Sequence, residues 1–158
     1  MSEFRPIEGN FQPAGARFAI VVARWNGEIT ESLLQGALRA FARQGIADDS
    51  IEVVRVPGAF ELPLAAKKLA ETGRIDAVLA LGCVIRGGTP HFDYVCSECA
   101  RGVGEVALTT GMPIAFGVLT TDNLQQAKDR SGDNEENKGE EAALCALEMV
   151  SLFQQLNS

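Results

Sequence analysis

The strongest candidate for a chemical site is the glycine-rich segment Gly82–His91, which follows an apolar run. Within it, Gly87 and Gly88 precede Thr89 and Pro90, the pair that we expect to cap and to begin a helix. Unpaired N–H groups at a helix start favour an anion, and glycine lets the backbone approach a phosphate closely. An ordinary tight connection between a strand and a helix would have the same composition, so this segment alone leaves both interpretations open.

His91, the only histidine in the chain, falls in the first turn of that expected helix. Imidazole exchanges protons near neutral pH, so His91 could act as an acid-base group on a ligand held at the anion site. A single histidine is more often a structural or surface residue. Its position at the expected carboxyl end of a strand favours the catalytic role.

Trp25, the only tryptophan, follows another apolar run and lies outside the expected core stripes. Its ring could stack on a flat heteroaromatic ligand; the alternative is a side chain that fills the seam between helix and sheet. Glu61 follows Phe60 at an expected helix start, where the helix dipole favours any carboxylate. A role for Glu61 in binding hydroxyl groups is therefore not distinctive by itself.

Cys96 and Cys99 have the spacing of a redox or zinc motif. No second cysteine pair and no second histidine are available to complete a tetrahedral site, and both residues fall on the apolar face of a helical pattern. We therefore interpret them as core residues and expect no metal site. All four cysteines, including Cys83 and Cys145, should be reduced.

Four short apolar runs must form the strands that position these residues. Their hydrophobicity is continuous rather than alternating, which is typical of strands buried on both faces of a parallel sheet. The runs cover residues 18–23, 51–56, 77–81 and 114–119. Ligands bind beyond the carboxyl ends of such strands, so the expected site is formed by the segments that follow: 24–27, 57–61, 82–91 and 120–122.

Apolar residues at helical spacing fill the segments between these runs. Three of the stripes end at Gly45, Gly73 and Gly111, each suited to the left-handed position that follows a helix. A short helix over residues 123–130 and a long C-terminal helix complete the pattern. The alternation predicts a flavodoxin-like, three-layer α/β/α sandwich with a four-stranded parallel sheet, formed by residues 17–158 as one domain.

Residues 1–16 contain two prolines and two glycines, show no periodicity, and are interpreted as an N-terminal arm. Phe4, Ile7 and Phe11 are apolar groups that an extended arm can bury only against something else, for which a neighbouring subunit is one candidate.

Composition limits the classes of function. The formal net charge of -7 disfavours nonspecific binding to nucleic acid or to an anionic membrane. The longest apolar run, Ala77–Ile85, is far shorter than the roughly 18 residues of a membrane span. Because the first residues lack a basic region followed by an apolar stretch, we expect no secretory signal and a cytoplasmic location.

Five segments together resemble the lumazine synthase family, in order and at its spacing: Ala23–Asn26, Pro57–Pro63, Gly82–Phe92, Phe116–Thr121 and Asn137–Gly139. Several motifs that match in register are far more specific than any one alone. The resemblance implies condensation of 5-amino-6-(D-ribitylamino)uracil with 3,4-dihydroxy-2-butanone 4-phosphate in riboflavin biosynthesis. It also implies that no metal or redox cofactor takes part.

The resemblance implies site residues as well. His91 would shuttle protons, and Arg130 from an adjacent subunit would bind the phosphate together with Gly88 and Thr89. Phe116 and Lys138 would come from the same neighbour. The pyrimidine, its ribityl chain and the surrounding pocket would involve Trp25, Asn26, Gly58, Ala59, Phe60, Glu61, Cys83, Val84 and Ile85.

Sites shared between subunits imply a homo-oligomer, either a pentamer or a sixty-subunit shell, with riboflavin synthase as a candidate partner. Trp25 replaces a common phenylalanine and Cys83 a common threonine, and neither change is expected to abolish activity. The acidic segment Asp133–Glu136 replaces a lysine, alanine and glycine of many relatives. This last departure bears on higher-order packing more than on catalysis.

Three other kinds of protein share this fold class. A flavodoxin-type cofactor carrier needs a Ser/Thr-rich phosphate loop after the first strand, and Trp25–Glu28 is not one. A receiver-type signalling domain needs clustered acidic residues there, which Arg24 and Trp25 contradict. A catalytically idle homologue that binds flavin or forms a shell keeps the same fold, so formation of a lumazine is needed to separate it from an enzyme.

Overall fold

The computed structural model describes residues 3–158 of the 158-residue chain. Within this range the strands are β1 (Phe18–Ala23), β2 (Ile51–Val56), β3 (Ala77–Ile85) and β4 (Ile114–Thr121). The helices are α1 (Gly27–Arg43), α2 (Leu62–Ala70), α3 (His91–Thr110), α4 (Leu124–Asp129) and α5 (Lys138–Leu156), with short 3-10 helices η1 (Asp48–Ser50) and η2 (Ala59–Glu61).

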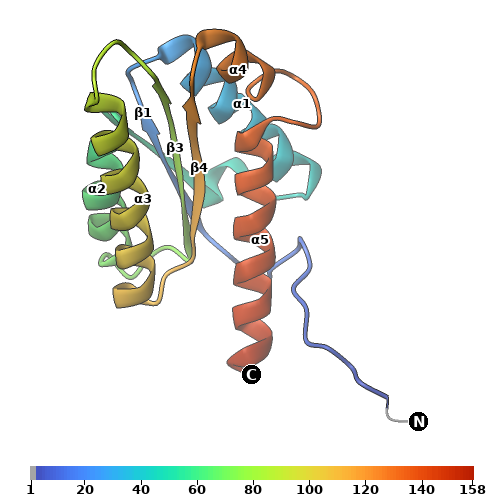
Figure 1. Ribbon diagram of the computed structural model, residues 1–158. Helices are drawn as coiled ribbons and strands as arrows, with labels where there is room; N and C mark the ends of the chain where they lie inside the picture. Colours follow the sequence, from blue (N-terminus) through green and yellow to red (C-terminus); the bar gives the residue numbers. More distant parts are fainter. Residues whose placement is uncertain (1–2) are drawn as a thin grey trace.

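Across residues 3–158 the four strands form one parallel sheet in the order β2-β1-β3-β4 (Figure 1). All six residues of β1 are buried, because this central strand pairs with β2 on one side and β3 on the other. The chain first winds outward to β2 and then returns past β1 to β3. The reversal places a topological switch point between β1 and β3, where open α/β sheets bind ligands.

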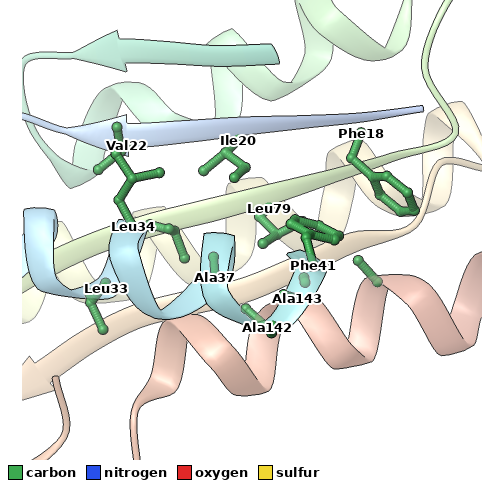
Figure 2. Packing of buried hydrophobic residues seen from close by; sticks show 14 of the residues in the cluster. Phe18, Ile20, Val22, Leu33, Leu34, Ala37, Phe41, Leu79, Ala142 and Ala143 are labelled. Atoms are coloured by element: carbon green, nitrogen blue, oxygen red, sulfur yellow. The ribbon is translucent and has the colours of Figure 1, made fainter. Parts of the chain in front are cut away.

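Helices cover both faces of the sheet, which confirms the predicted three-layer α/β/α sandwich (Figure 1). Helices α1, α4 and α5 pack on one face, and α2 and α3 pack on the other. Figure 2 shows the first of these cores, where Phe18 of β1 and Phe41 of α1 meet beside Leu79 of β3. The two aromatic ring centroids lie 4.9 Å apart at an interplanar angle of 42°, a tilted pairing that favours edge contacts.

The predicted helix ends are confirmed at three glycines. Gly45, Gly73 and Gly111 have φ angles of 78°, 74° and 69°, in the left-handed region that side chains with a Cβ rarely adopt. The predicted ends of two strands are wrong. Strand β3 continues beyond Leu81 through Ile85, and β4 continues beyond Leu119 through Thr121.

The expected start of α3 is wrong by one residue. The helix begins at His91 with Pro90 in the cap position, and no side chain, including that of Thr89, forms a capping hydrogen bond there. Asp93 N–H instead donates to the Pro90 carbonyl at 3.0 Å. The amino end of α3 therefore keeps backbone donors that no side chain satisfies.

The arm runs beside α5 of its own chain and is bound to it by polar contacts. Asn10 N–H donates to Ser151 Oγ at 3.0 Å, and Gln154 Nε2 donates to the Ala14 carbonyl at 2.9 Å. The side chains of Phe4 and Ile7 nevertheless stay largely exposed. That a neighbouring subunit covers these side chains stays a prediction. The domain boundary after residue 16 stays a prediction as well.

None of the helices formed by residues 3–158 combines the length and the apolar character needed to cross a membrane.

Candidate active site

A cavity of about 490 Å³ opens at the switch point between β1 and β3. Three carboxyl-end segments and the first turns of α3 form its walls, so residues far apart in the sequence meet here. The lining comprises Trp25, Asn26, Gly58, Ala59, Phe60, Glu61, Cys83, Val84, Ile85, His91, Tyr94, Val95 and Glu98. Ten of the residues predicted from the sequence are therefore brought together in one pocket.

Asn26 connects the two strands at the switch point. It has a φ of 59°, the one positive φ outside glycine among residues 3–158, and it precedes the first turn of α1. Its side-chain Nδ2 donates to the Cys83 carbonyl at 2.8 Å. This contact holds the segment after β1 against the end of β3 and leaves Asn26 Oδ1 as an acceptor for a ligand.

The indole of Trp25 lies against Gly58, so the segments after β1 and β2 meet at the pocket. Backbone hydrogen bonds from Arg24 N–H to the Val56 carbonyl (2.8 Å) and from Trp25 N–H to the Pro57 carbonyl (3.0 Å) fix this approach. Trp25 is 63% exposed, which excludes the alternative that it fills the seam between helix and sheet. One face of the ring is supported by backbone, and the ring remains accessible to a flat ligand.

Cys83 contributes a neutral thiol to the pocket floor. Burial raises the pKa of Cys83 to about 11, with a smaller contribution from Cys96, and burial has the same effect on Cys99. A thiol with such a pKa is protonated at neutral pH and is a poor nucleophile. The interpretation of Cys99 as a core residue is confirmed, whereas Cys96 is only half-buried.

The turn between β3 and α3 projects beside the pocket with little packing of its own. A Cβ on Gly87 or Gly88 would meet no atom within 4 Å, and neither residue has a positive φ. The chain itself therefore does not require glycine at these positions. Thr89 and His91, which follow in the same segment, are exposed.

Five predicted site residues lie outside this pocket: Gly88 and Thr89 in the turn beside it, and Phe116, Arg130 and Lys138. Arg130 and Lys138 instead line a second hollow of about 240 Å³ beyond the end of β4, together with Gln126. Arg130 Nη1 donates to the Gln126 carbonyl at 2.9 Å, and Lys138 pairs with Glu141 at 2.9 Å. Phe116 on β4 is 46% exposed. Within one chain, an aromatic pocket and a basic hollow are thus separate.

Comparison with protein-family models decides which family this fold belongs to. The family model of 6,7-dimethyl-8-ribityllumazine synthase matches residues 15–154, nearly the whole chain. The chain belongs to this family. Membership makes it a transferase of riboflavin biosynthesis that acts on small-molecule substrates. A flavodoxin-type carrier and a receiver domain are no longer alternatives for this lumazine synthase family member.

Sequence reasoning missed three pocket residues: Tyr94, Val95 and Glu98. They follow His91 by three, four and seven positions, the spacing of one helix face. That periodicity could have found them once His91 was placed in the first turn. In this lumazine synthase family member, α3 therefore supplies a whole wall of the pocket.

The two buried thiols predict how folding stability depends on pH. Their pKa values rise from 9.0 to about 11 on burial, so the unfolded chain releases these protons first. Their contribution to stability is complete below pH 9 and should be lost as pH rises to about 11, on the order of 1–2 kcal/mol per thiol.

The measurement is urea unfolding at pH 8 to 11, compared with the double variant Cys83→Ala/Cys99→Ala. The variant removes the two groups but keeps every other titration of the chain, so the difference between the curves isolates the thiols. A wild-type curve that falls no faster than that of the variant would contradict this prediction.

Proposed function

We propose that the chain condenses 5-amino-6-(D-ribitylamino)uracil with 3,4-dihydroxy-2-butanone 4-phosphate to give 6,7-dimethyl-8-ribityllumazine. One observation carries the proposal beyond family membership: the exposed Trp25 ring, backed by Gly58, lines the same cavity as His91, the residue that follows the glycine turn. A flat ring and a phosphorylated partner can then lie side by side, which is the orientation that a two-substrate condensation needs.

The pyrimidine stacks on Trp25 in this proposal. Main-chain groups of Cys83 to Ile85 at the end of β3 face the pyrimidine edge, and Asn26 Oδ1 is available to accept from it. Glu61 lies in the wall formed by η2 and accepts hydrogen bonds from ribityl hydroxyl groups. Gly58, Ala59 and Phe60 complete the wall next to the ring.

Gly58→Ala tests the aromatic platform. The new Cβ would collide with the Trp25 ring and tilt it, so KM for the pyrimidine should rise about tenfold, equivalent to about 1.4 kcal/mol of lost stacking. Because Trp25 is the only tryptophan, its fluorescence reports the displacement directly. The control is Gly104→Ala, where a Cβ meets nothing within 4 Å. Unchanged fluorescence and KM in Gly58→Ala would refute the platform.

The phosphate of the ketone binds at the turn with Gly88 and Thr89, where the first N–H groups of α3 favour an anion. Arg130 of a neighbouring copy supplies a guanidinium that can hold two phosphate oxygens at once. Phe116 and Lys138 reach the site from the same copy. The separation of the basic hollow from the pocket within one chain supports this division.

The chemistry then needs no potent nucleophile. The 5-amino group attacks the C2 ketone and forms an imine with loss of water. Removal of a proton from C3 expels phosphate from C4, and the resulting enol becomes a C3 ketone. The ribityl-bearing amine closes the ring on C3 with loss of a second water. His91, exposed at the pocket edge, takes the proton from C3 and passes it to the phosphate oxygen that leaves C4.

A complete site then requires at least two copies in head-to-tail contact, and such contacts close into a ring. We propose a pentamer as the basic ring. Assembly of rings into a sixty-subunit shell depends on surfaces that include the acidic segment Asp133–Glu136, and riboflavin synthase is a candidate partner of such an assembly. A sizing measurement distinguishes the two forms.

The test supplies both substrates to the purified protein and measures the fluorescent lumazine together with inorganic phosphate. The proposal expects one phosphate for each lumazine. A protein whose Trp25 fluorescence is quenched by riboflavin, but which forms no lumazine, would be the idle flavin-binding homologue instead.

A further inference from the structure

Arg86, the first residue after β3, contacts residues at the end of β4 and in the first turn of α3. Its backbone N–H donates to the Thr121 carbonyl at 2.8 Å. Its side-chain Nε donates to Asp122 Oδ1 at 2.9 Å, and Nη1 lies 3.4 Å from Asp93 Oδ1. The guanidinium carbon also lies 4.4 Å from the centroid of the Phe92 ring. One side chain thereby touches the end of β4 and the first turn of α3.

These contacts join the two ends of the β3–α3 turn. Arg86 stands at one end of the turn, and Phe92 and Asp93 stand at the other, so the guanidinium joins the two ends. Between them, a Cβ on Gly87 or Gly88 would find no neighbour within 4 Å. Because these two glycines have no neighbours to hold them, the position of the turn depends on the contacts that Arg86 makes with Phe92 and Asp93.

The same polar network continues to Arg130. Asp122 N–H donates to Gln126 Oε1 at 2.7 Å, and the Gln126 carbonyl accepts from Arg130 Nη1 at 2.9 Å. Gln126 is itself fixed by Asn123 Oδ1, which accepts from its N–H at 2.9 Å. The β3–α3 turn and Arg130 of one chain are thus attached to the same anchor, Arg86. In the proposed function these two groups bind phosphate in two different sites, because Arg130 acts in the site of a neighbouring copy.

We propose that Arg86 is a positioning residue for phosphate binding, acting through the β3–α3 turn and, through Asp122 and Gln126, on Arg130. This inference rests on the proposed function. The positioning role is separable from a structural one, because the side chains of Arg86, Asp93 and Asp122 are 47%, 61% and 65% exposed. Ion pairs so accessible to water contribute little to folding stability.

The test compares Arg86→Ala with the matched variant Arg74→Ala. Arg74 is 52% exposed and pairs with Glu52 at 2.6 Å, at the opposite end of the sheet. Arg86→Ala should raise KM for the phosphorylated ketone and the inhibition constant of inorganic phosphate about tenfold or more, since small misplacements of binding groups are costly. The pyrimidine KM and the urea midpoint should match those of Arg74→Ala.

Asp122→Asn weakens the same contact from its other side with little change of volume. It should also raise KM for the ketone and the inhibition constant of phosphate. Arg86→Lys should lie between wild type and Arg86→Ala, because an ammonium cannot span both carboxylates. Ketone and phosphate constants that stay within twofold of wild type in Arg86→Ala and Asp122→Asn would overturn the inference. Equal shifts for both substrates would do so as well. A wild-type protein that forms no lumazine would instead overturn the proposed function.

Discussion

Replacing Arg130 with alanine should lower kcat/KM for the phosphorylated ketone by about 10²–10³-fold, because a guanidinium bound to a phosphate dianion makes two charge-assisted hydrogen bonds. Arg130 is exposed beyond the end of β4, and its Nη1 contact is to a main-chain carbonyl. Folding should therefore change little. The pyrimidine KM should stay near the wild-type value, since the pocket around Trp25 is separate from Arg130.

Two variants make this experiment specific. Arg130→Lys keeps the charge but loses the forked geometry, and should recover only part of the activity. Lys128→Ala removes an exposed cation of α4, whose nearest carboxylate is Glu28 at 3.8 Å, and should leave both constants within twofold. Steady-state kinetics with each substrate varied in turn supply the numbers. Normal use of the ketone by Arg130→Ala would remove Arg130 from the site.

Asn137→Ala should cost about 3–5 kcal/mol of folding stability, an effect typical of breaking a buried polar network. Asn137 is fully buried, and its Oδ1 accepts from Glu140 N–H at 3.0 Å, which caps α5. Its Nδ2 donates to the carbonyls of Ser131 and Gly132 at 3.0 and 2.9 Å. Alanine would leave these groups in the interior without partners.

Asn134→Ala is the matched control, because Asn134 is exposed and accepts only a local hydrogen bond from Glu136 N–H at 2.8 Å. Urea unfolding of both variants should separate them by several kcal/mol. Asn137→Ala should also impair turnover, because Lys138 N–H is bound to the Arg130 carbonyl at 2.9 Å and the loop carries both cations. Equal stability of the two variants would show that the network is not important for folding.

Local sequence patterns were sufficient for most of the fold. Short apolar runs predicted all four strands, and the glycines after the helices predicted where three helices end. The expected burial on both faces holds for β1 but is wrong for the edge strand β2, where only Val56 is buried. The end of β3 was missed because Gly82 looks like the start of a turn. In the structure a Cβ there would lie 3.1 Å from Leu62 Cδ1, so glycine serves a close approach of α2 to the strand.

The site was only partly predictable for a different reason. Strand ends and the family resemblance located Trp25, His91 and Glu61, and the structure brings them into one pocket. Arg86 gave no local signal for its contact with Asp122, because the two residues lie far apart in the sequence. The spacing of Asn137 and Glu140 is that of a helix cap, but the contact of Asn137 with the Ser32 carbonyl was not predictable from local spacing. Arg130 could not be placed beside the pocket from the pattern of one chain, because in the proposed function a second copy supplies it.

The central claim is that one active site is divided between two copies of the chain, and mixed assemblies test it most directly. Trp25→Ala/His91→Ala disables the pocket, and Arg130→Ala disables the phosphate side. Each variant alone should form nearly inactive rings. Unfolded together and reassembled at random in equal amounts, they should unite two intact faces in about a quarter of the interfaces, because each face is intact half the time.

Lumazine formation by the mixed rings, relative to wild-type rings treated in the same way, is the quantity to measure. Mass measurement on rings in which one variant carries a heavy isotope establishes that mixing occurred. Activity should recover towards a quarter of the wild-type value. Mixed rings that remain as inactive as either parent would show that the site is built within one chain, and would contradict the roles given to Phe116, Arg130 and Lys138.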